Sequence, residues 1–111
     1  MEANKEVVVS ANSEVLCCDS ISGRYFKSTV NDIGRAVNNV NKQLLYDMYI
    51  SLNEFYDELE LPHTDVGDEL GWNLDDGLIE MEYGSKISED GQPCILLSYN
   101  LSPRYDYSKL L

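Results

Sequence analysis

The sequence of 111 residues contains three cysteines and one histidine, the residue types that bind zinc or act in nucleophilic catalysis. A zinc site needs several Cys and His side chains gathered around one ion. Cys17 and Cys18 are adjacent, so in a strand their side chains point to opposite faces. Cys94 and His63 lie far along the chain, and His63 follows Pro62 in an expected turn. The pattern therefore argues against a zinc site and against a Cys–His or Ser–His catalytic pair.

Carboxylates are the other group that could do chemistry, since residues 54–90 contain thirteen Asp or Glu. A calcium loop of the EF-hand type needs oxygen ligands at positions 1, 3 and 5, glycine at 6 and glutamate at 12. With Gly77 or Gly91 at position 6, position 12 would be Tyr83 or Leu97, so both loops fail. Adjacent carboxylates fall in expected exposed turns, with no apolar pocket to raise a pKa. We predict that the chain is not an enzyme and binds no metal or cofactor.

The cysteine count also suggests a redox compartment. Three is an odd number, and the N-terminal residues lack the apolar run of an export signal. We interpret the cysteines as reduced, buried thiols in a cytoplasmic setting, with a Cys17–Cys94 disulfide as the alternative. No apolar run approaches the ~20 residues of a membrane span.

The negative charge of the chain is unevenly distributed. The formal net charge is −12, from 20 acidic and 8 basic residues. Residues 1–53 have a net charge of −1 and residues 91–111 of +1, whereas residues 54–90 contain only one base, Lys86, and have a net charge of −12. A field of this sign attracts cationic partners and repels nucleic acid and anionic lipid. The acidic region can therefore be a binding surface for a basic partner. The alternatives to partner binding are a solvated face that keeps the chain soluble, and a cation site.

We predict that the acidic region 54–90 binds a basic surface of a partner protein, without direct contact to nucleic acid or membrane. Tyrosine and arginine of the C-terminal tail are added because these residue types make interface hot spots. The alternative for the tail is a strand docked on its own domain. The candidate partner-binding residues are Glu54, Asp57, Glu58, Glu60, Asp65, Asp68, Glu69, Asp75, Asp76, Glu80, Glu82, Arg104, Tyr105 and Tyr107.

In the first half of the chain, short strands precede one clear helix. β-Branched and apolar residues predict strands over Lys5–Ser10, Glu14–Cys18 and Arg24–Ser28. A helix with an N-cap at Thr29 is expected next, because apolar residues then recur at intervals of three and four. These residues are Val30, Ile33, Val37, Val40 and Leu44.

In the second half, Ser51 and Glu54 have the spacing of a capping box, which predicts a short helix that ends before Pro62. A second short helix is expected over Asp65–Leu70, with Gly71 as its C-cap and Trp72 in the core.

A C-terminal antiparallel hairpin follows, with Ile79, Met81 and Tyr83 facing inward and a return strand over Cys94–Asn100. We predict one α+β domain over residues 1–111, in which residues 1–10 are a peripheral strand or a flexible end.

Several short motifs resemble a family of small acidic proteins from phages, prophages and mobile elements of Firmicutes. The resemblance covers roughly residues 23–107 and is carried by Gly23–Phe26, Ala36–Asn38, Tyr49–Asp57, Gly67–Asn73, Gly91–Cys94 and Pro103–Tyr107. It implies a phage-type gene and a bacterial cytoplasm, and it supplies no activity and no site residues.

Taken together, charge and resemblance lead to two hypotheses from different classes. The first is a non-catalytic protein-binding module, for example an inhibitor that mimics nucleic acid by presenting carboxylates where phosphates would lie. The second is a self-associating phage structural or assembly protein, which would form homo-oligomers.

Overall fold

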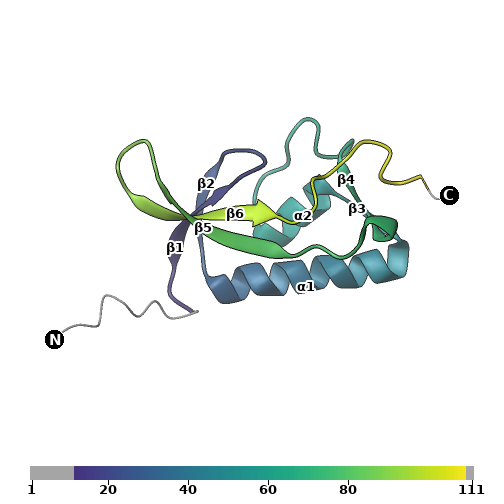
Figure 1. The fold of residues 1–111 in the computed structure, drawn as a ribbon, viewed down its shortest axis with the longest axis horizontal. Coiled ribbons are helices and arrows are strands. Elements are labelled where there is room, and N and C mark those ends of the chain that lie inside the picture. Colours follow the sequence, from purple (N-terminus) through teal and green to yellow (C-terminus); the bar gives the residue numbers. More distant parts are fainter. Residues whose placement is uncertain (1–11, 110–111) are drawn as a thin grey trace.

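The computed structural model describes residues 12–109, so the strand expected over Lys5–Ser10 lies outside the described residues. The described chain contains both helices and strands (Figure 1), which agrees with the predicted α+β class. Its elements are β1 (Val15–Asp19), β2 (Tyr25–Ser28), α1 (Val30–Asp47), β3 (Tyr49–Ser51), α2 (Leu52–Leu59), β4 (Gly71–Asn73), the 3₁₀-helix η1 (Leu74–Asp76), β5 (Met81–Ile87) and β6 (Pro93–Tyr99).

Four of the strands form one mixed sheet in the order β2-β1-β6-β5. The β1–β2 and β5–β6 pairs are antiparallel, whereas β1 and β6 run parallel. Figure 1 shows α1 lying along this sheet. The strands β3 and β4 make a separate antiparallel pair, in which Ile50 lies opposite Trp72. The N-terminal strands and the C-terminal hairpin therefore meet through a parallel pairing that local sequence does not reveal.

Helix α1 has the start and the buried face that the sequence predicts. The Thr29 side chain accepts a hydrogen bond from the Asp32 amide, which caps the first turn. Ile33, Val40 and Leu44 are fully buried. The helix ends at Met48, which has a left-handed backbone with φ of 77° and donates its amide hydrogen to the Leu44 carbonyl. Tertiary packing of this apolar face compensates for the weak helix propensity of its valines and Gly34.

Helix α2 also begins as predicted, with a complete capping box. The Glu54 amide donates to Ser51 Oγ at 3.1 Å, and the Ser51 amide donates to Glu54 Oε1 at 2.8 Å. The exposed face of α2 presents its carboxylates, while Phe55 and Tyr56 are buried. This short helix thus joins an apolar anchor to a charged surface.

The second short helix expected over Asp65–Leu70 is wrong, because that segment forms turns. The buried Asn53 side chain accepts the Thr64 amide at 2.9 Å and donates to the Thr64 carbonyl at 3.2 Å. A Cβ at Gly67 would lie 1.9 Å from Asn53 Oδ1, so only glycine permits this approach. The Asn53 side chain thus satisfies the Thr64 backbone, and the Asn53 backbone amide donates to the Gly67 carbonyl at 3.0 Å. Gly71 starts β4, where a helix C-cap was expected.

An aromatic cluster joins α2, β4 and β6 in the core. Trp72 is buried as predicted, and its ring centroid lies 5.5 Å from that of Phe55 and 5.8 Å from that of Tyr99. The Trp72 indole donates to the Leu101 carbonyl at 2.9 Å. This cluster holds the start of the C-terminal tail against α2.

The C-terminal hairpin is confirmed, but one inward assignment in it is wrong. Ile79 is buried and Met81 is half-buried, whereas Tyr83 is largely exposed. Because β5 is an edge strand of the described sheet and pairs only with β6, Tyr83 is covered less than a residue of a central strand. The three cysteines are free and buried.

Candidate functional site

The most densely hydrogen-bonded carboxylate of the described chain is buried at the end of β1. Asp19 has no exposed surface and accepts hydrogen bonds from the hydroxyls of Tyr56 and Tyr99, each at 2.7 Å. It also accepts from the Ser22 amide at 3.0 Å and from the Ser22 hydroxyl at 2.7 Å. Four donors therefore surround one carboxylate that links β1, α2 and β6.

This buried cluster stabilises the fold and offers no access to a substrate. Burial and the neighbouring Asp19 carboxylate raise the pKa values of Tyr56 and Tyr99 above the ordinary 10.0, so both hydroxyls stay protonated and donate. Arg24 covers the cluster, with its guanidinium carbon 4.8 Å from the Tyr56 ring centroid and Nη1 donating to the Pro62 carbonyl at 2.8 Å. The arrangement ties the turn after β1 to the end of α2.

Seven of the predicted site residues gather around α2 and the loop that follows it. Asp57 lies 2.7 Å from His63 and so joins the helix to the loop, and Asp68 lies 3.0 Å from the Asn53 amide nitrogen. All seven side chains are exposed. We call this the α2 acidic surface, formed by Glu54, Asp57, Glu58, Glu60, Asp65, Asp68 and Glu69.

Few basic groups compensate this charge. Among the described residues, only Asp57 of the seven carboxylates is in an ion pair, and its partner His63 is exposed. Glu54 and Glu58 border α1, where they accept hydrogen bonds from the neutral amides of Gln43 and Asn39. Within the described residues, six of these seven carboxylates therefore have no basic partner.

The remaining predicted carboxylates lie elsewhere, so the acidic region is not one continuous face. Glu80 and Glu82 are on the segment that enters the edge strand β5. Asp75 and Asp76 are in η1, where Asp76 pairs with Arg104 at 2.7 Å. With Glu89 and Asp90 in the turn between β5 and β6, the acidic region 54–90 is therefore divided among four parts of the fold.

The C-terminal tail is held on its own domain, in keeping with the alternative considered for it. Arg104 forms a β-bridge with Gly71, and the Tyr107 hydroxyl donates to the Asp68 carbonyl at 2.8 Å. The Tyr107 ring packs edge-to-face on Tyr49, with centroids 6.0 Å apart. Of the three predicted tail residues, Tyr105 alone makes no side-chain hydrogen bond or ring contact within residues 12–109, and it is 59% exposed.

A polar groove of about 470 Å³ lies between the start of α1, β2 and the end of α2. Charges of both signs line it, including Lys27, Arg35, Asp32 and Glu58. Arg35 already pairs with Asp32 at 2.7 Å. Because the charges are mixed and partly paired, the groove selects no one class of ligand.

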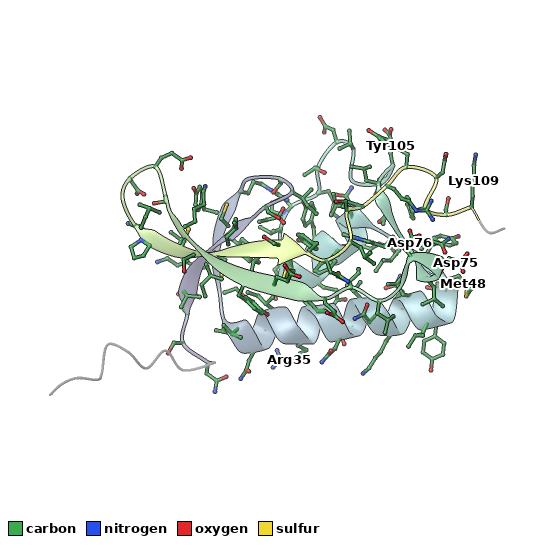
Figure 2. All side chains as sticks on the ribbon, in the orientation of Figure 1. Arg35, Met48, Asp75, Asp76, Tyr105 and Lys109 are labelled. Carbon is green, nitrogen blue, oxygen red and sulfur yellow. The ribbon has the colours of Figure 1, made fainter. Side chains whose placement is uncertain are left out.

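Sequence reasoning missed two features. The first is the role of Asp19, at which only the local Asp–x–x–Ser spacing hints, because Tyr56 and Tyr99 are 37 and 80 residues away. The second is the end of α1, where Leu45, Tyr46 and Met48 are exposed. Figure 2 shows Met48, Asp75 and Asp76 together at this end of the molecule. The sequence offers one signal for this exposed group. Leu44, Leu45 and Tyr46 are successive apolar residues, and three residues in a row cannot all lie on the one buried face of a helix.

Residues 12–109 contain no group of three or more His, Cys, Asp or Glu side chains placed to hold a metal ion. Within the same range, neither helix combines the length and apolar character that crossing a bilayer requires.

Comparison with known proteins places this α+β chain in a family. Residues 1–108 match the model of a family described as "Family of unknown function (DUF6353)". The match covers nearly the whole chain, so the chain belongs to this family. No curated protein and no solved structure matches it.

Proposed function

We propose that this chain is a non-catalytic protein-binding module whose α2 acidic surface binds a basic surface of another protein. The observation that carries the proposal is the group of seven exposed carboxylates with a single, exposed histidine as ion-pair partner in the described part. Charges that a fold uses for its own stability are normally paired or hydrogen-bonded, as Asp19 is. Charges left exposed on one surface act on what approaches it.

The proposal has a finer form, which draws on the sequence resemblance to phage and mobile-element proteins. The partner would then be a host or phage protein that binds nucleic acid, and the module would occupy its binding groove as an inhibitor in the bacterial cytoplasm. The group of exposed carboxylates on α2 and its loop supports this form, because such carboxylates can meet the same Lys and Arg that meet phosphates. Competition with nucleic acid for the captured partner would test it.

Salt dependence of binding provides the main test. The full chain is immobilised and exposed to bacterial lysate at about 50 mM and about 500 mM salt, between which the Debye length shortens several-fold. We expect basic proteins to be retained at low salt and released at high salt. If no basic protein is retained at low salt, the proposal is wrong.

Two charge variants with the same net charge make this test specific to a surface. Asp65→Asn with Glu69→Gln removes two carboxylates of the α2 acidic surface that make no side-chain hydrogen bond or ion pair within residues 12–109. Glu80→Gln with Glu82→Gln removes two exposed carboxylates at β5. The proposal expects reduced capture by the first variant and unchanged capture by the second.

Self-association as a structural or assembly protein is the second candidate. Its support is β5, an edge strand of the described sheet with exposed Tyr83 and Ile87, because an unpaired edge can add a strand from another copy. Light scattering over a wide concentration range tests it. Discrete oligomers would favour this function, and a strict monomer would eliminate it.

A further inference from the structure

Exposed apolar side chains concentrate at the C-terminal end of α1. Nine large apolar side chains are exposed in the described residues, and four of them lie within residues 45–49. A fifth, Leu78, follows η1, which is hydrogen-bonded to the end of α1 through the Leu74 amide and the Met48 carbonyl. Tyr46 is 86% exposed and Leu45 is 58% exposed, although both belong to a regular helix. We call this group the α1-end patch, formed by Leu45, Tyr46, Met48, Tyr49 and Leu78.

The backbone under the α1-end patch is fixed by hydrogen bonds. The Leu74 amide donates to the Met48 carbonyl at 2.8 Å, which ties η1 to the end of α1. The Asn41 side chain accepts from the Ile79 amide and donates to the Ile79 carbonyl, each at 2.9 Å. The residues of the patch are thus presented by a rigid frame, which lowers the entropy cost of binding.

Carboxylates and helix carbonyls lie at the end of α1 that presents these apolar side chains. The two basic residues near η1 are already paired, Arg104 with Asp76 and Lys109 with Asp106. A helix C-terminus has a partial negative charge from its last carbonyls, and the last turn of α1 contains no basic residue to offset it. Asp47 and Asp75 are exposed and are in no ion pair among the described residues. The nearest basic residue of α1 is Lys42, which lies before the last turn. The end of α1 therefore favours a donor or a cation.

The α1-end patch is also continuous with the α2 acidic surface. Tyr49 packs on Tyr107, whose hydroxyl donates to the Asp68 carbonyl. Burial and then the carboxylates of Glu54 and Asp68 raise the pKa of Tyr107, which agrees with their closeness. An apolar area with an acidic border has the composition of an interface core and its rim.

We propose that the α1-end patch is the docking site for a segment of a partner protein that presents an apolar side chain next to an arginine or lysine. The apolar side chain packs among Leu45, Tyr46 and Met48, and the cation lies over a tyrosine ring or near the last carbonyls of α1. This inference rests on the proposed function, since it specifies the basic partner. A second copy fits less well, because it would bring the same carboxylates against Asp47 and Asp75.

The test uses two synthetic peptides and the full chain labelled with ¹⁵N. One peptide is an amphipathic helix of leucine and arginine, and the other has glutamate in place of every arginine. At about 150 mM salt, where the Debye length is about 8 Å, we expect the leucine–arginine peptide to shift the amide resonances of residues 45–49 and 74–78. The leucine–glutamate peptide should shift none of them.

Two matched double variants locate the contact. Leu45→Ser with Tyr46→Ser should weaken binding of the leucine–arginine peptide by about tenfold, about 1.4 kcal/mol. Both side chains are exposed, so we expect the variant to fold. Tyr83→Ser with Ile87→Ser removes the same kinds of exposed side chain from β5 and should leave the affinity unchanged.

Several results would contradict the docking site. They are no shift at the α1-end patch, equal binding of the glutamate peptide, or unchanged affinity in the Leu45 and Tyr46 variant. A dimer that this variant abolishes would identify a second copy as the occupant. If shifts appear only at the α2 acidic surface, the docking site is wrong while the proposed function stands. The peptide can also bind at the α1-end patch with an affinity that Asp65→Asn with Glu69→Gln leaves unchanged. The docking site is then supported, and the α2 acidic surface takes no part in it.

Discussion

Asp19 and the carboxylates of the α2 acidic surface are the same chemical group in opposite environments. Asp19 is fully buried and accepts four hydrogen bonds from Ser22, Tyr56 and Tyr99. Asp65 and Glu69 are exposed and make no side-chain contact of this kind within the described residues. The first carboxylate is built into the fold, whereas the others face solvent or a partner.

The difference shows which charges stability explains and which it does not. A buried carboxylate is tolerated only when donors replace its water, so its surroundings are determined by folding. An exposed carboxylate contributes little to stability, because solvent screens it. Three carboxylates of the α2 acidic surface, Glu60, Asp65 and Glu69, make no side-chain hydrogen bond or ion pair within residues 12–109. These three therefore need another explanation than folding, either solubility or binding.

Removal of the Asp19 carboxylate should have the largest effect on stability. Asp19→Ala leaves the Tyr56 and Tyr99 hydroxyls and the Ser22 groups without their acceptor. We expect a loss of about 3 kcal/mol in the free energy of unfolding. Urea denaturation followed by circular dichroism measures it.

Asp65→Ala is the matched control and should change the free energy of unfolding by no more than about 0.5 kcal/mol. Similar losses of stability in the two variants would contradict the claim that the buried carboxylate stabilises the fold and the exposed one does not.

Alkaline pH should have the second largest effect on the free energy of unfolding, through the two tyrosines that donate to Asp19. Their folded pKa values lie above the unfolded value of 10.0, so the unfolded state loses these protons first as pH rises. Their contribution is complete below pH 10 and is lost above it, at up to about 1.4 kcal/mol per pH unit for each tyrosine. Urea midpoints at about pH 8 and about pH 11 test this.

Tyr56→Phe tests the role of the tyrosines in this pH dependence, because it removes one of the two hydroxyl protons that are donated to Asp19. The loss of stability between the two pH values should be smaller in this variant than in the unaltered chain. Cys17 adds a loss of its own that begins near pH 9, since burial raises its pKa from 9.0 to about 11, and this loss is common to the variant and the unaltered chain. An identical loss of stability in the variant and the unaltered chain would show that the Tyr56 proton does not contribute to the pH dependence.

Partial neutralisation of the α2 acidic surface should have the smallest effect on folding. Asp65→Asn with Glu69→Gln reduces like-charge repulsion and should raise the free energy of unfolding at low salt by no more than about 0.5 kcal/mol. The gain should vanish at high salt because the repulsion is then screened. A clear loss of stability would instead show that these carboxylates hold the fold.

Local features of the fold are predictable from sequence because their partners are close along the chain. Thr29 and the Asp32 amide are three residues apart, as are Ser51 and Glu54, and both caps are present. The hairpin between β5 and β6 follows from its short turn, where Gly91 has a positive φ of 84°. Such signals require no knowledge of the rest of the molecule.

The remaining features depend on contacts between distant segments. The parallel pairing of β1 with β6 joins residues near 17 to residues near 95, and no local pattern encodes it. The helix expected over Asp65–Leu70 is absent because the side chain of Asn53, eleven residues before Thr64, bonds the backbone groups of Thr64 and holds the segment in turns. The carboxylates of the acidic region 54–90 are likewise separated by the fold, which places them on α2 and its loop, in η1, at β5 and in the β5–β6 turn.

The most direct test of the central claim is the affinity of the basic protein captured at low salt, measured by titration calorimetry at about 150 mM salt. We predict that Asp65→Asn with Glu69→Gln weakens binding about fivefold, from about 0.5 kcal/mol for each exposed charge pair. Glu80→Gln with Glu82→Gln, which changes the net charge equally, should weaken it less than about twofold. Equal effects of the two variants, or no effect of the first, would contradict the claim that the α2 acidic surface binds the partner.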